Sequence, residues 1–183
     1  MKHDYYFFEN VFSKESCDHI ADRLEKDSKS SNKKDNPAPN TIKTATVSVA
    51  SWREAKEYLK DFETLVQEVN IDIFGFDLYS LTDSMGVNYN VYDESNQGQY
   101  DWHNDAVAGE MSDIKLTAIA NLSTKPYLGG DFELFLNCPR HVSQFDNPGS
   151  VLIFPSWIQH RVTPVTQGQR KTLSIWFKGP LFR

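Results

Sequence analysis

The sequence has few cysteines, no long hydrophobic run and no excess of basic residues, and each shortage excludes a class of protein. Its two cysteines, Cys17 and Cys138, are too few for a disulfide framework, so we expect reduced thiols and a cytoplasmic location. No apolar stretch is long enough to cross a membrane. The short apolar run near the N-terminus follows Asp4 and is not typical of a signal peptide, so we expect no membrane partner.

The balance of charge is acidic. Lysine and arginine number 19 against 25 aspartate and glutamate residues, which gives a formal net charge of −6 and a pI of about 5.3. Broad binding of nucleic acid needs a basic face, so nucleic acid is an unlikely partner. The chain has 183 residues, of which 39% are hydrophobic and 13% aromatic. These values predict one globular domain, 1–183, with a core of ordinary size.

The chain is predicted to begin with a strand over 5–12 and a helix over 14–27. Ser13 can serve as the N-cap of this helix, and apolar residues recur along it at helical spacing. Residues 28–40 have no apolar periodicity and predict a flexible loop. A plain surface connection is one interpretation of this loop, and a lid that closes over a substrate is the other.

A second strand and a longer helix are predicted to follow the loop. The strand is expected over 41–50, where β-branched residues alternate weakly. The helix is expected over 52–70, after the capping box that Ser51 and Glu54 can form. Its apolar stripe predicts packing against a sheet. We interpret 1–76 as an N-terminal strand and helix region that supports the rest of the chain.

The remainder, 77–183, is dense in short apolar segments separated by Gly, Pro, Asn or Asp, and no helical pattern interrupts them. We expect strands near 78–81, 86–92, 98–103, 114–122, 131–136, 150–154, 159–164 and 170–178. About eight antiparallel strands in this length are typical of a double-sheet jelly roll. The predicted fold class is therefore mainly β, a jelly roll with flanking N-terminal helices.

Two histidines and one aspartate form a candidate metal site. His103 and Asp105 are two residues apart, so on a strand they project to the same face. His160 is a third candidate ligand, and Arg170 follows it by ten residues. Two histidines and a carboxylate are the facial ligand set of non-haem Fe(II) oxygenases. His141 is expected to lie in a loop and not to bind the metal.

With these motifs the chain resembles the Fe(II)/2-oxoglutarate-dependent dioxygenases, in particular the prolyl 4-hydroxylase-like branch. The resemblance runs from about residue 87 to 178 in the order of the family. Its elements are Tyr92, Gly98-Gln-Tyr100, His103-Asn-Asp105, Gly129-Gly-Asp-Phe-Glu-Leu-Phe135, Phe154-Pro-Ser-Trp-Ile-Gln-His160, Val162-Thr-Pro-Val165 and Gly168-Gln-Arg170. The resemblance implies that the jelly roll is a double-stranded β-helix.

The resemblance also implies roles for individual residues. His103, Asp105 and His160 would hold Fe(II), and Arg170 would bind the far carboxylate of 2-oxoglutarate, for which a planar guanidinium is well suited. Further candidates for binding 2-oxoglutarate are Tyr92, with Tyr89 as its competitor, Ser174 and Asn121. Asn121 stands where some relatives carry a tyrosine, and a packed strand residue is its other interpretation. Tyr100 and Trp176 are candidates for the substrate side of the pocket.

Arg170 begins an alternating segment that supports this assignment. Its neighbours Thr172, Ser174 and Trp176 share one face of a strand, while Leu173 and the other apolar residues share the opposite face. In a barrel with one wet interior face, the first set would line the pocket.

The activity implied is hydroxylation of an unactivated C–H bond, coupled to conversion of 2-oxoglutarate to succinate and carbon dioxide. Fe(II), 2-oxoglutarate and O2 are the implied cofactors, with ascorbate as a candidate reductant. A prolyl residue of a peptide or protein is the first choice of substrate, and another amino-acid side chain or a small molecule stays open. Two alternatives also stay open: a cupin-type metal-binding barrel, and an inactive binding module without 2-oxoglutarate chemistry.

Overall fold

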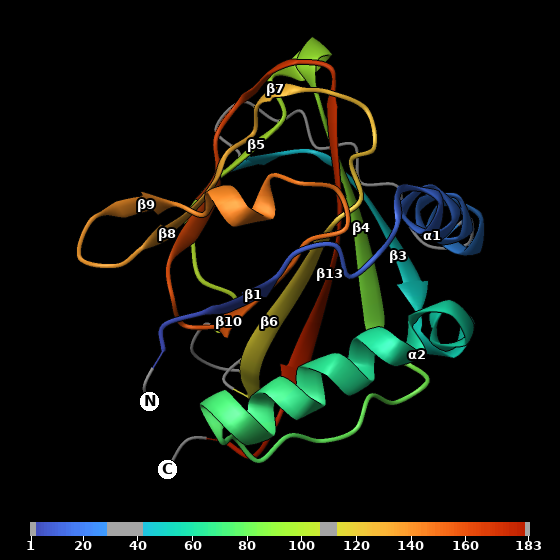
Figure 1. The fold of residues 1–183 in the computed structure, drawn as a ribbon, viewed down its shortest axis with the longest axis vertical. Helices are drawn as coiled ribbons and strands as arrows, with labels where there is room; N and C mark the ends of the chain where they lie inside the picture. Colours follow the sequence, from blue (N-terminus) through green and yellow to red (C-terminus); the bar gives the residue numbers. More distant parts are fainter. Residues whose placement is uncertain (1–2, 29–41, 107–112, 182–183) are drawn as a thin grey trace.

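The computed structural model describes residues 3–28, 42–106 and 113–181. Apart from Ser28, the loop predicted over 28–40 lies outside the described residues. Two antiparallel sheets form the body of the molecule (Figure 1). Their strands are mostly short, and a pair of helices accompanies them, so the predicted fold class, a mainly β jelly roll with flanking helices, is confirmed.

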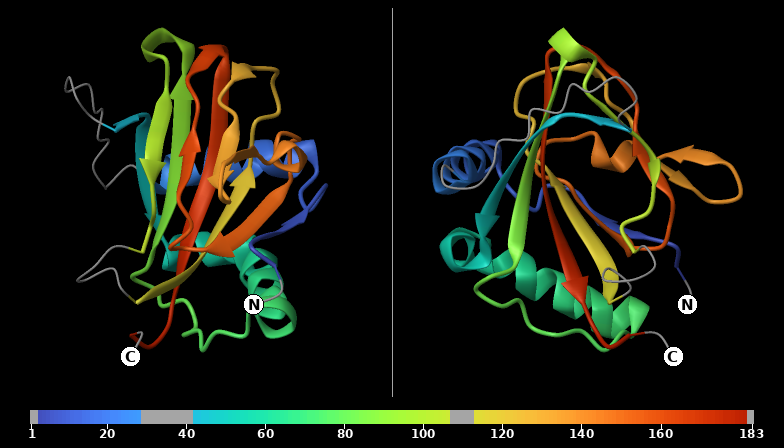
Figure 2. Two further views of the ribbon diagram at one scale, coloured as in Figure 1. Left: turned by 90° about the vertical axis from the view of Figure 1, so that its left-hand side faces the viewer. Right: turned by 180° about the vertical axis from the view of Figure 1, so that it is seen from behind.

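The larger sheet has six strands in the order β1-β10-β6-β13-β4-β3. These strands are β1 (Tyr6–Phe8), β3 (Thr46–Ser51), β4 (Gly86–Asp93), β6 (Ile114–Asn121), β10 (Val151–Pro155) and β13 (Gln169–Lys178). In Figure 2 the long strands β4, β13 and β6 lie side by side. They form the wall on which much of the site is built.

The smaller sheet has five strands in the order β2-β5-β11-β8-β9. These strands are β2 (Lys43–Thr44), β5 (Gln99–His103), β8 (Phe132–Phe135), β9 (Pro139–His141) and β11 (His160–Val162). A separate pair joins β7 (Leu128–Gly129) to β12 (Val165–Gln167). The N-terminal region contributes to both large sheets, because β1 and β3 are edge strands of one and β2 is an edge strand of the other.

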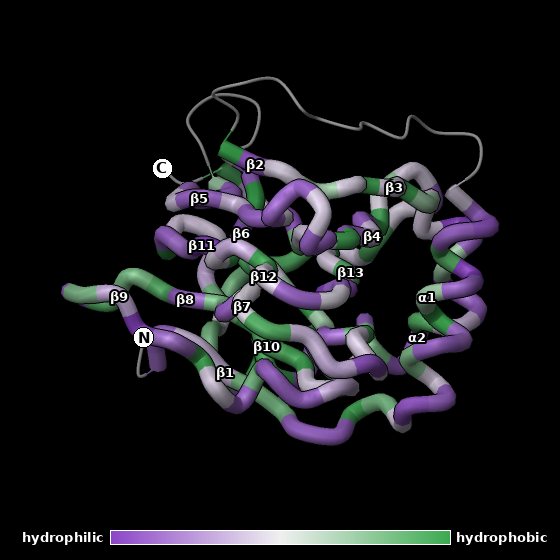
Figure 3. The backbone as a smooth tube through the Cα atoms, turned by 90° about the horizontal axis from the view of Figure 1, so that it is seen from above, coloured by the Kyte–Doolittle hydropathy of each residue, from purple (hydrophilic) through white to green (hydrophobic). Residues whose placement is uncertain are grey.

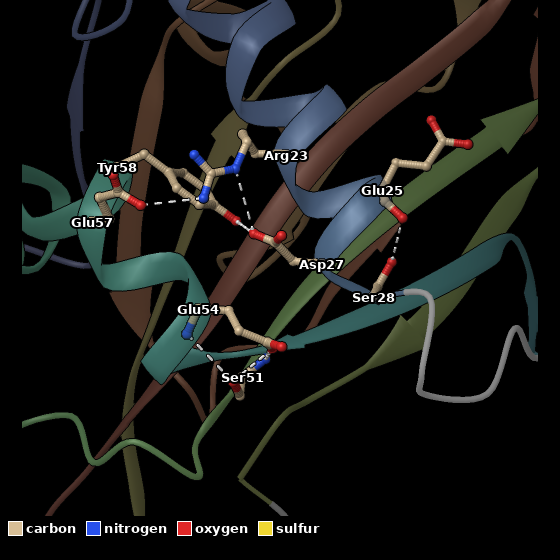
Figure 4. Close-up of polar contacts among 8 residues, drawn as sticks. All are labelled: Arg23, Glu25, Asp27, Ser28, Ser51, Glu54, Glu57 and Tyr58. Atoms are coloured by element: carbon tan, nitrogen blue, oxygen red, sulfur yellow. Dashed lines mark hydrogen bonds and ion pairs between the residues drawn. The ribbon is translucent and has the colours of Figure 1, made fainter.

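Two helices cover the six-stranded sheet (Figures 1 and 3). Helix α1 spans Lys14–Asp27, and its N-cap Ser13 accepts a hydrogen bond from the Ser16 amide. Helix α2 spans Trp52–Val69 and begins with the predicted capping box of Ser51 and Glu54 (Figure 4). Both predicted helices are therefore confirmed. Within the described residues, no helix is long and apolar enough to cross a membrane.

The contact between α1 and α2 carries polar bonds at its edge. Arg23 lies 3.7 Å from Asp27 and 3.3 Å from Glu57, and the Tyr58 hydroxyl donates to Asp27 at 3.0 Å (Figure 4). Ion pairs with one exposed partner, such as Glu57, contribute little stability. The helices are held mainly by their buried faces, which carry Cys17, Ile20, Ala21 and Leu24 in α1 and Trp52, Ala55, Leu59, Phe62, Val66 and Val69 in α2.

The interior has two apolar clusters, one on each face of the six-stranded sheet. Leu173, Ile175 and Phe177 of β13 pack with the helices in the first cluster. The second cluster lies between the two sheets and joins, for example, Phe154 of β10 to Phe132 of β8. The alternate residues of β13 therefore face the space between the sheets, as the alternation after Arg170 predicted.

Several predicted strands differ in extent. The strand predicted over 5–12 ends at Phe8, because Asn10 has a positive φ of 58° and the next amides, of Val11 and Phe12, bond to the Gly149 carbonyl. The strand predicted over 41–50 divides into β2 and β3, which join different sheets.

Two further predictions were wrong. No strand forms over 78–81, where the Tyr79 amide bonds to the Lys178 carbonyl but the Leu81 amide bonds to the Glu63 carboxylate. His141 belongs to the short strand β9 and not to a loop.

After α2 the chain makes a π-helical turn, Asn70–Phe74, and leaves it through Gly75 with φ 72°.

Candidate active site

Paired strands bring the three predicted metal ligands together. His103 ends β5, His160 begins β11, and the two residues are partners in the strand register. Asp105 follows β5 by two residues. One donor atom of each residue lies within 4.8 Å of the others. The Asp105 oxygens are 3.9 Å from His103 Nε2 and 3.6 Å from His160 Nε2, too long for direct hydrogen bonds.

Backbone carbonyls fix the orientation of both imidazoles. His103 Nδ1 lies 2.7 Å from the Asp101 carbonyl oxygen, and His160 Nδ1 lies 3.0 Å from the Ile158 carbonyl oxygen. A carbonyl can only accept, so each Nδ1 carries a proton and each Nε2 presents its lone pair to the centre. Metal-bound histidines in other proteins also donate their second ring N–H to an acceptor of this kind.

Burial keeps both imidazoles neutral. It lowers the pKa of His103 to about 4, with the neighbouring His160 as a further cause. Burial also lowers the pKa of His160. Neutral imidazole is the form that binds a metal. Two neutral imidazoles and one carboxylate fit Fe(II) in the facial arrangement with open positions.

The carboxylate of Asp105 is held by β6 and by the loop after β10. The Thr117 hydroxyl donates to Asp105 Oδ2 at 2.6 Å, and Ser156 Oγ lies 3.1 Å from the same Thr117 oxygen. The amides of Asp105 and Ala106 both donate to the Ser156 carbonyl, at 2.9 Å and 3.0 Å. This support sets the Asp105 side chain, which is almost completely buried, in one direction.

The triad lies in a cavity between the two sheets. The space between atoms at this site is about 650 Å³, counting the open solvent at its mouth. Of the predicted site residues, the structure places His103, Asp105, His160, Tyr92, Tyr100, Arg170, Ser174 and Trp176 in its wall. Sequence reasoning missed others that line it, among them Lys43, Asn88, Asn90 and Thr117.

Arg170 is buried in this cavity, and the described part of the chain gives it no counter-ion. Only 2% of the residue is exposed, and no carboxylate of the described residues lies within 4 Å of its guanidinium. Its Cζ lies 5.4 Å from the Tyr92 ring centroid and 5.6 Å from that of Phe145. Gly130 leaves room beside it, because a Cβ there would come 2.9 Å from Arg170 Cδ. A buried guanidinium of this kind suits a ligand carboxylate.

The structure separates the tyrosine candidates. Tyr92 on β4 lines the cavity, while Tyr89 packs in the cluster beneath the helices. Burial raises the pKa of the Tyr92 phenol, so its hydroxyl stays protonated and can donate to a ligand. Tyr92 is thus the better placed of the two.

Asn121 does not line the cavity, contrary to the expectation that it binds 2-oxoglutarate. Its amide nitrogen donates to the carbonyls of Phe145 and Asp146, and its amide oxygen accepts from the Ser123 amide. Through these bonds the Asn121 side chain holds the loop that precedes β10. The alternative interpretation, a packed strand residue, describes it correctly.

Tyr100 and Trp176 flank the metal end of the cavity. The Tyr100 ring stacks on His103 with a centroid distance of 3.4 Å. Trp176 is the register partner of Thr117, the residue that holds Asp105. Ser174 Oγ accepts from Asn90 Nδ2 at 3.4 Å, which leaves the Ser174 hydroxyl proton free for another acceptor.

Lys43 is the most informative residue that sequence reasoning missed. It lies on β2, and its Nζ donates to Asn90 Oδ1 at 2.8 Å across the cavity. Burial lowers the pKa of Lys43 to about 8, although the Asp105 carboxylate opposes this shift. The signal for Lys43 is absent from its local sequence, because its role depends on which sheet β2 joins.

A protein-family model described as the 2OG-Fe(II) oxygenase superfamily matches residues 87–178. This match covers half of the chain, and the chain belongs to the 2OG-Fe(II) oxygenase superfamily. It is an oxidoreductase of the dioxygenase class, with the iron and 2-oxoglutarate dependence of that family. No relative was found among curated protein sequences.

Solved structures of prolyl hydroxylases share the fold. The chain is similar to a prolyl-4-hydroxylase from Pseudomonas putida, with TM-score 0.74, 18% identity and coverage of 98% of this chain and 94% of that one. It is also similar to a prolyl hydroxylase from Trichoplax adhaerens in complex with a hypoxia inducible factor peptide fragment, with TM-score 0.71, 16% identity and coverage of 97% and 84%. A third similar structure is a viral collagen prolyl hydroxylase from Paramecium Bursaria Chlorella virus-1 in complex with 2OG. Its TM-score is 0.66 and its identity 14%, and the match covers 98% of each chain.

Proposed function

We propose that the protein hydroxylates an unactivated C–H bond of a prolyl or other amino-acid residue and converts 2-oxoglutarate and O2 to succinate and carbon dioxide. The observation that carries this proposal is the buried Arg170, which shares one cavity with the triad of His103, Asp105 and His160. A metal centre and a buried carboxylate receptor in one cavity match a bifunctional acid such as 2-oxoglutarate.

The residues of the chain would act by holding and orienting. His103, Asp105 and His160 would hold Fe(II), which when bound supplies the redox chemistry with O2. Arg170 would bind the far carboxylate of 2-oxoglutarate, with the hydroxyls of Tyr92 and Ser174 as further donors. Tyr100 and Trp176 would shape the side of the cavity that the substrate enters. Ascorbate would serve as a reductant that keeps the iron ferrous.

A peptide substrate is supported by the comparisons. The structures that share the fold include prolyl hydroxylases, and one of them holds a peptide fragment. A prolyl residue is therefore our first choice, and another amino-acid side chain or a small molecule is the second. The small number of cysteines, Cys17 and Cys138, is the basis on which we propose a cytoplasmic location.

The competing function is a cupin-type metal-binding barrel, or an inactive binding module, without 2-oxoglutarate chemistry. Titration of the Fe(II)-loaded protein with 2-oxoglutarate under anaerobic conditions separates the two, since the chelate gives a metal-to-ligand charge-transfer band. Arg170→Ala should weaken 2-oxoglutarate binding by roughly ten- to a thousandfold, because charged hydrogen bonds contribute about 1.5–3 kcal/mol and loss of one buried partner costs more. Arg170→Lys should recover part of the loss, since it restores charge without the planar fork.

Arg53→Ala is the matched control for this titration, because Arg53 is an exposed arginine paired with Asp83. It should bind 2-oxoglutarate as the parent does. Candidate peptides are then incubated with the protein, Fe(II), 2-oxoglutarate and O2, and mass spectrometry follows succinate and a gain of one oxygen by the peptide. A parent protein that shows no charge-transfer band and forms no succinate is not an oxygenase.

A further inference from the structure

Lys43 places a second cation inside the cavity. Strand β2 pairs with β5 so that Lys43 is the register partner of Tyr100. From there its side chain crosses to the six-stranded sheet, where Nζ donates to Asn90 Oδ1 at 2.8 Å, and Nζ lies 4.6 Å from the Tyr100 ring centroid. Lysines usually keep their ammonium group in water. This one is turned inward and joins the two sheets.

The ammonium of Lys43 lies at the metal end of the cavity. The Tyr100 ring stacks on His103 at 3.4 Å, so the Lys43 Nζ is within about 8 Å of the His103 ring centroid, the largest value that the two distances allow. Its charge contributes to the lowered pKa of His103 and of His160. Asp105 is the carboxylate that acts on Lys43 in return. Lys43 Nζ also lies 5.9 Å from the Tyr92 ring centroid, and Arg170 Cζ lies 5.4 Å from the same centroid. The two cations therefore flank Tyr92, with Lys43 also beside Tyr100.

The described residues that contact Lys43 do not neutralise it. An ammonium has three N–H donors, and its hydrogen-bond acceptor among the described residues is the neutral amide of Asn90. No carboxylate in the described part of the chain lies within 4 Å of Nζ. The Asn90 amide is itself fixed, since it also donates to Ser174. Among the described residues, Asn90 thus holds Lys43 in position, and the other N–H donors of the ammonium have no hydrogen-bond acceptor there.

When the charges of the cofactors are added to those of the cavity, one positive charge stays uncompensated. Fe(II) brings two positive charges, Asp105 one negative charge, and Arg170 and Lys43 one positive charge each. The two carboxylates of 2-oxoglutarate, whose binding rests on the proposed function, leave one positive charge without compensation. A buried charge is costly unless it is paired, so an anionic group of the substrate is the natural partner.

We propose that Lys43 is a specificity-determining residue that binds a carboxylate of the substrate beside the metal. The substrate is then an acidic molecule, or a peptide with a carboxylate next to the carbon that is hydroxylated. The iron-bound carboxylate of 2-oxoglutarate offers the same chemistry to Lys43. The experiment must therefore distinguish a carboxylate of the substrate from one of the cosubstrate.

The test uses pairs of probes that differ only in a carboxylate or an amide: N-acetylproline against its amide, and prolyl peptides with Asp or with Asn on either side of the proline. Their affinities for the Fe(II)-loaded protein, with 2-oxoglutarate saturating and O2 absent, are measured by calorimetry. The parent should prefer the carboxylate member of at least one pair by about tenfold or more, equivalent to about 1.4 kcal/mol. Lys43→Met should reduce that preference to less than twofold, and Lys43→Arg should retain part of it.

The control is Lys60→Met, which removes the charge of an exposed lysine on α2 and should leave the preference unchanged. Lys43→Met should weaken 2-oxoglutarate itself by less than tenfold, well short of Arg170→Ala. If Lys43→Met matches Arg170→Ala in that loss, Lys43 serves the cosubstrate and the proposal is wrong. It is also wrong if no pair shows the preference, or if the preference survives Lys43→Met.

This failure is distinct from failure of the proposed function. Absence of the charge-transfer band with 2-oxoglutarate refutes the oxygenase, and the probe pairs can then be titrated into the Fe(II)-loaded protein alone. A band without any preference for a carboxylate refutes only the role of Lys43.

Discussion

His103 and His160 lie opposite each other on neighbouring antiparallel strands, and their ring centroids are 4.1 Å apart. Strand pairing therefore joins two candidate ligands that are distant in the sequence. The backbone carbonyls that accept from each Nδ1 belong to the same chain segments, two residues before each histidine. Because sheet hydrogen bonds and these carbonyls fix both rings, the donor atoms are in place before a metal arrives, as a rigid site requires.

Removal of one ligand should abolish tight metal binding. His160→Ala takes away one of three donors, and we expect the affinity for Fe(II) to fall by more than about 100-fold, beyond the loss typical of supporting residues. Anaerobic calorimetry with Fe(II) measures the change. His141→Ala is the matched control, because His141 is exposed on β9 and contacts Asp146. Equal affinity of His160→Ala and the parent would exclude His160 as a ligand.

The hydroxyl of Thr117 should contribute measurably to the affinity for Fe(II). Thr117→Val keeps the volume of the side chain but removes the donor that lies 2.6 Å from Asp105 Oδ2. We expect Fe(II) binding to weaken by about 10–100-fold, the range for residues that orient a ligand. Thr172→Val is the control, because Thr172 is a buried threonine of the same cavity with no hydrogen bond to Asp105 among the described residues. The two variants should differ in the same calorimetric titration, and equal affinities would contradict this role of Thr117.

Local patterns in the sequence predicted the elements whose signals are local. Helix α1 and its cap Ser13 depend on residues within one turn, and so does the capping box at Ser51. Along β13, alternation alone separates Arg170 and its polar neighbours from the apolar face. The cavity contains both His103 and Asp105, as their motif predicted. Strand alternation is not the reason, because β5 ends at His103, and the Ser156 carbonyl and the Thr117 hydroxyl hold Asp105 instead.

Features that depend on pairing between distant strands could not be predicted. The break at Ala45 sends β2 and β3 to different sheets, and Lys43 on β2 lines the cavity. Asn121 lies on a strand that borders the site, but the loop before β10 takes up its amide. The apolar segment 78–81 has strand-like composition and lacks a partner strand in the described part of the chain. In each case, a distant segment decides the outcome.

The space beside Arg170 should depend on Gly130. In Gly130→Ala the new Cβ would come 2.9 Å from Arg170 Cδ and from Val165 Cγ2, at a φ of 68° that L-residues rarely adopt. We expect a loss of stability in urea denaturation and a weaker affinity for 2-oxoglutarate in the anaerobic titration. Gly75→Ala is the control, since its φ of 72° is similar but nothing lies within 4 Å. It should lose about 1–2 kcal/mol and bind 2-oxoglutarate normally. Unchanged 2-oxoglutarate binding by Gly130→Ala would show that Arg170 tolerates displacement.

Burial of Lys43 should also be visible in the pH dependence of stability. The pKa of Lys43 is lowered from 10.5 to about 8 in the folded protein, chiefly by burial. Below pH 8 the side chain is charged in both states, and the folded state bears the full cost of the buried charge. Between about pH 8 and 10.5 the unfolded state binds more protons, so this residue makes stability rise with pH. Above 10.5 it is neutral in both states and the contribution is constant.

At neutral pH, Lys43→Met should therefore have a larger free energy of unfolding than the parent. This difference should shrink as the pH rises. One pKa unit corresponds to about 1.36 kcal/mol, so the difference in unfolding free energy between Lys43→Met and the parent should shrink by on the order of 2–3 kcal/mol from pH 7 to 10.5. Urea denaturation at several pH values measures this difference, in which the titration of shared groups cancels. Lys60→Met removes an exposed charge and should give a difference that stays flat. A flat difference for Lys43→Met would mean that the ammonium is solvated in the folded protein, whereas the expected slope would show that the folded protein keeps this cation buried at a cost in stability.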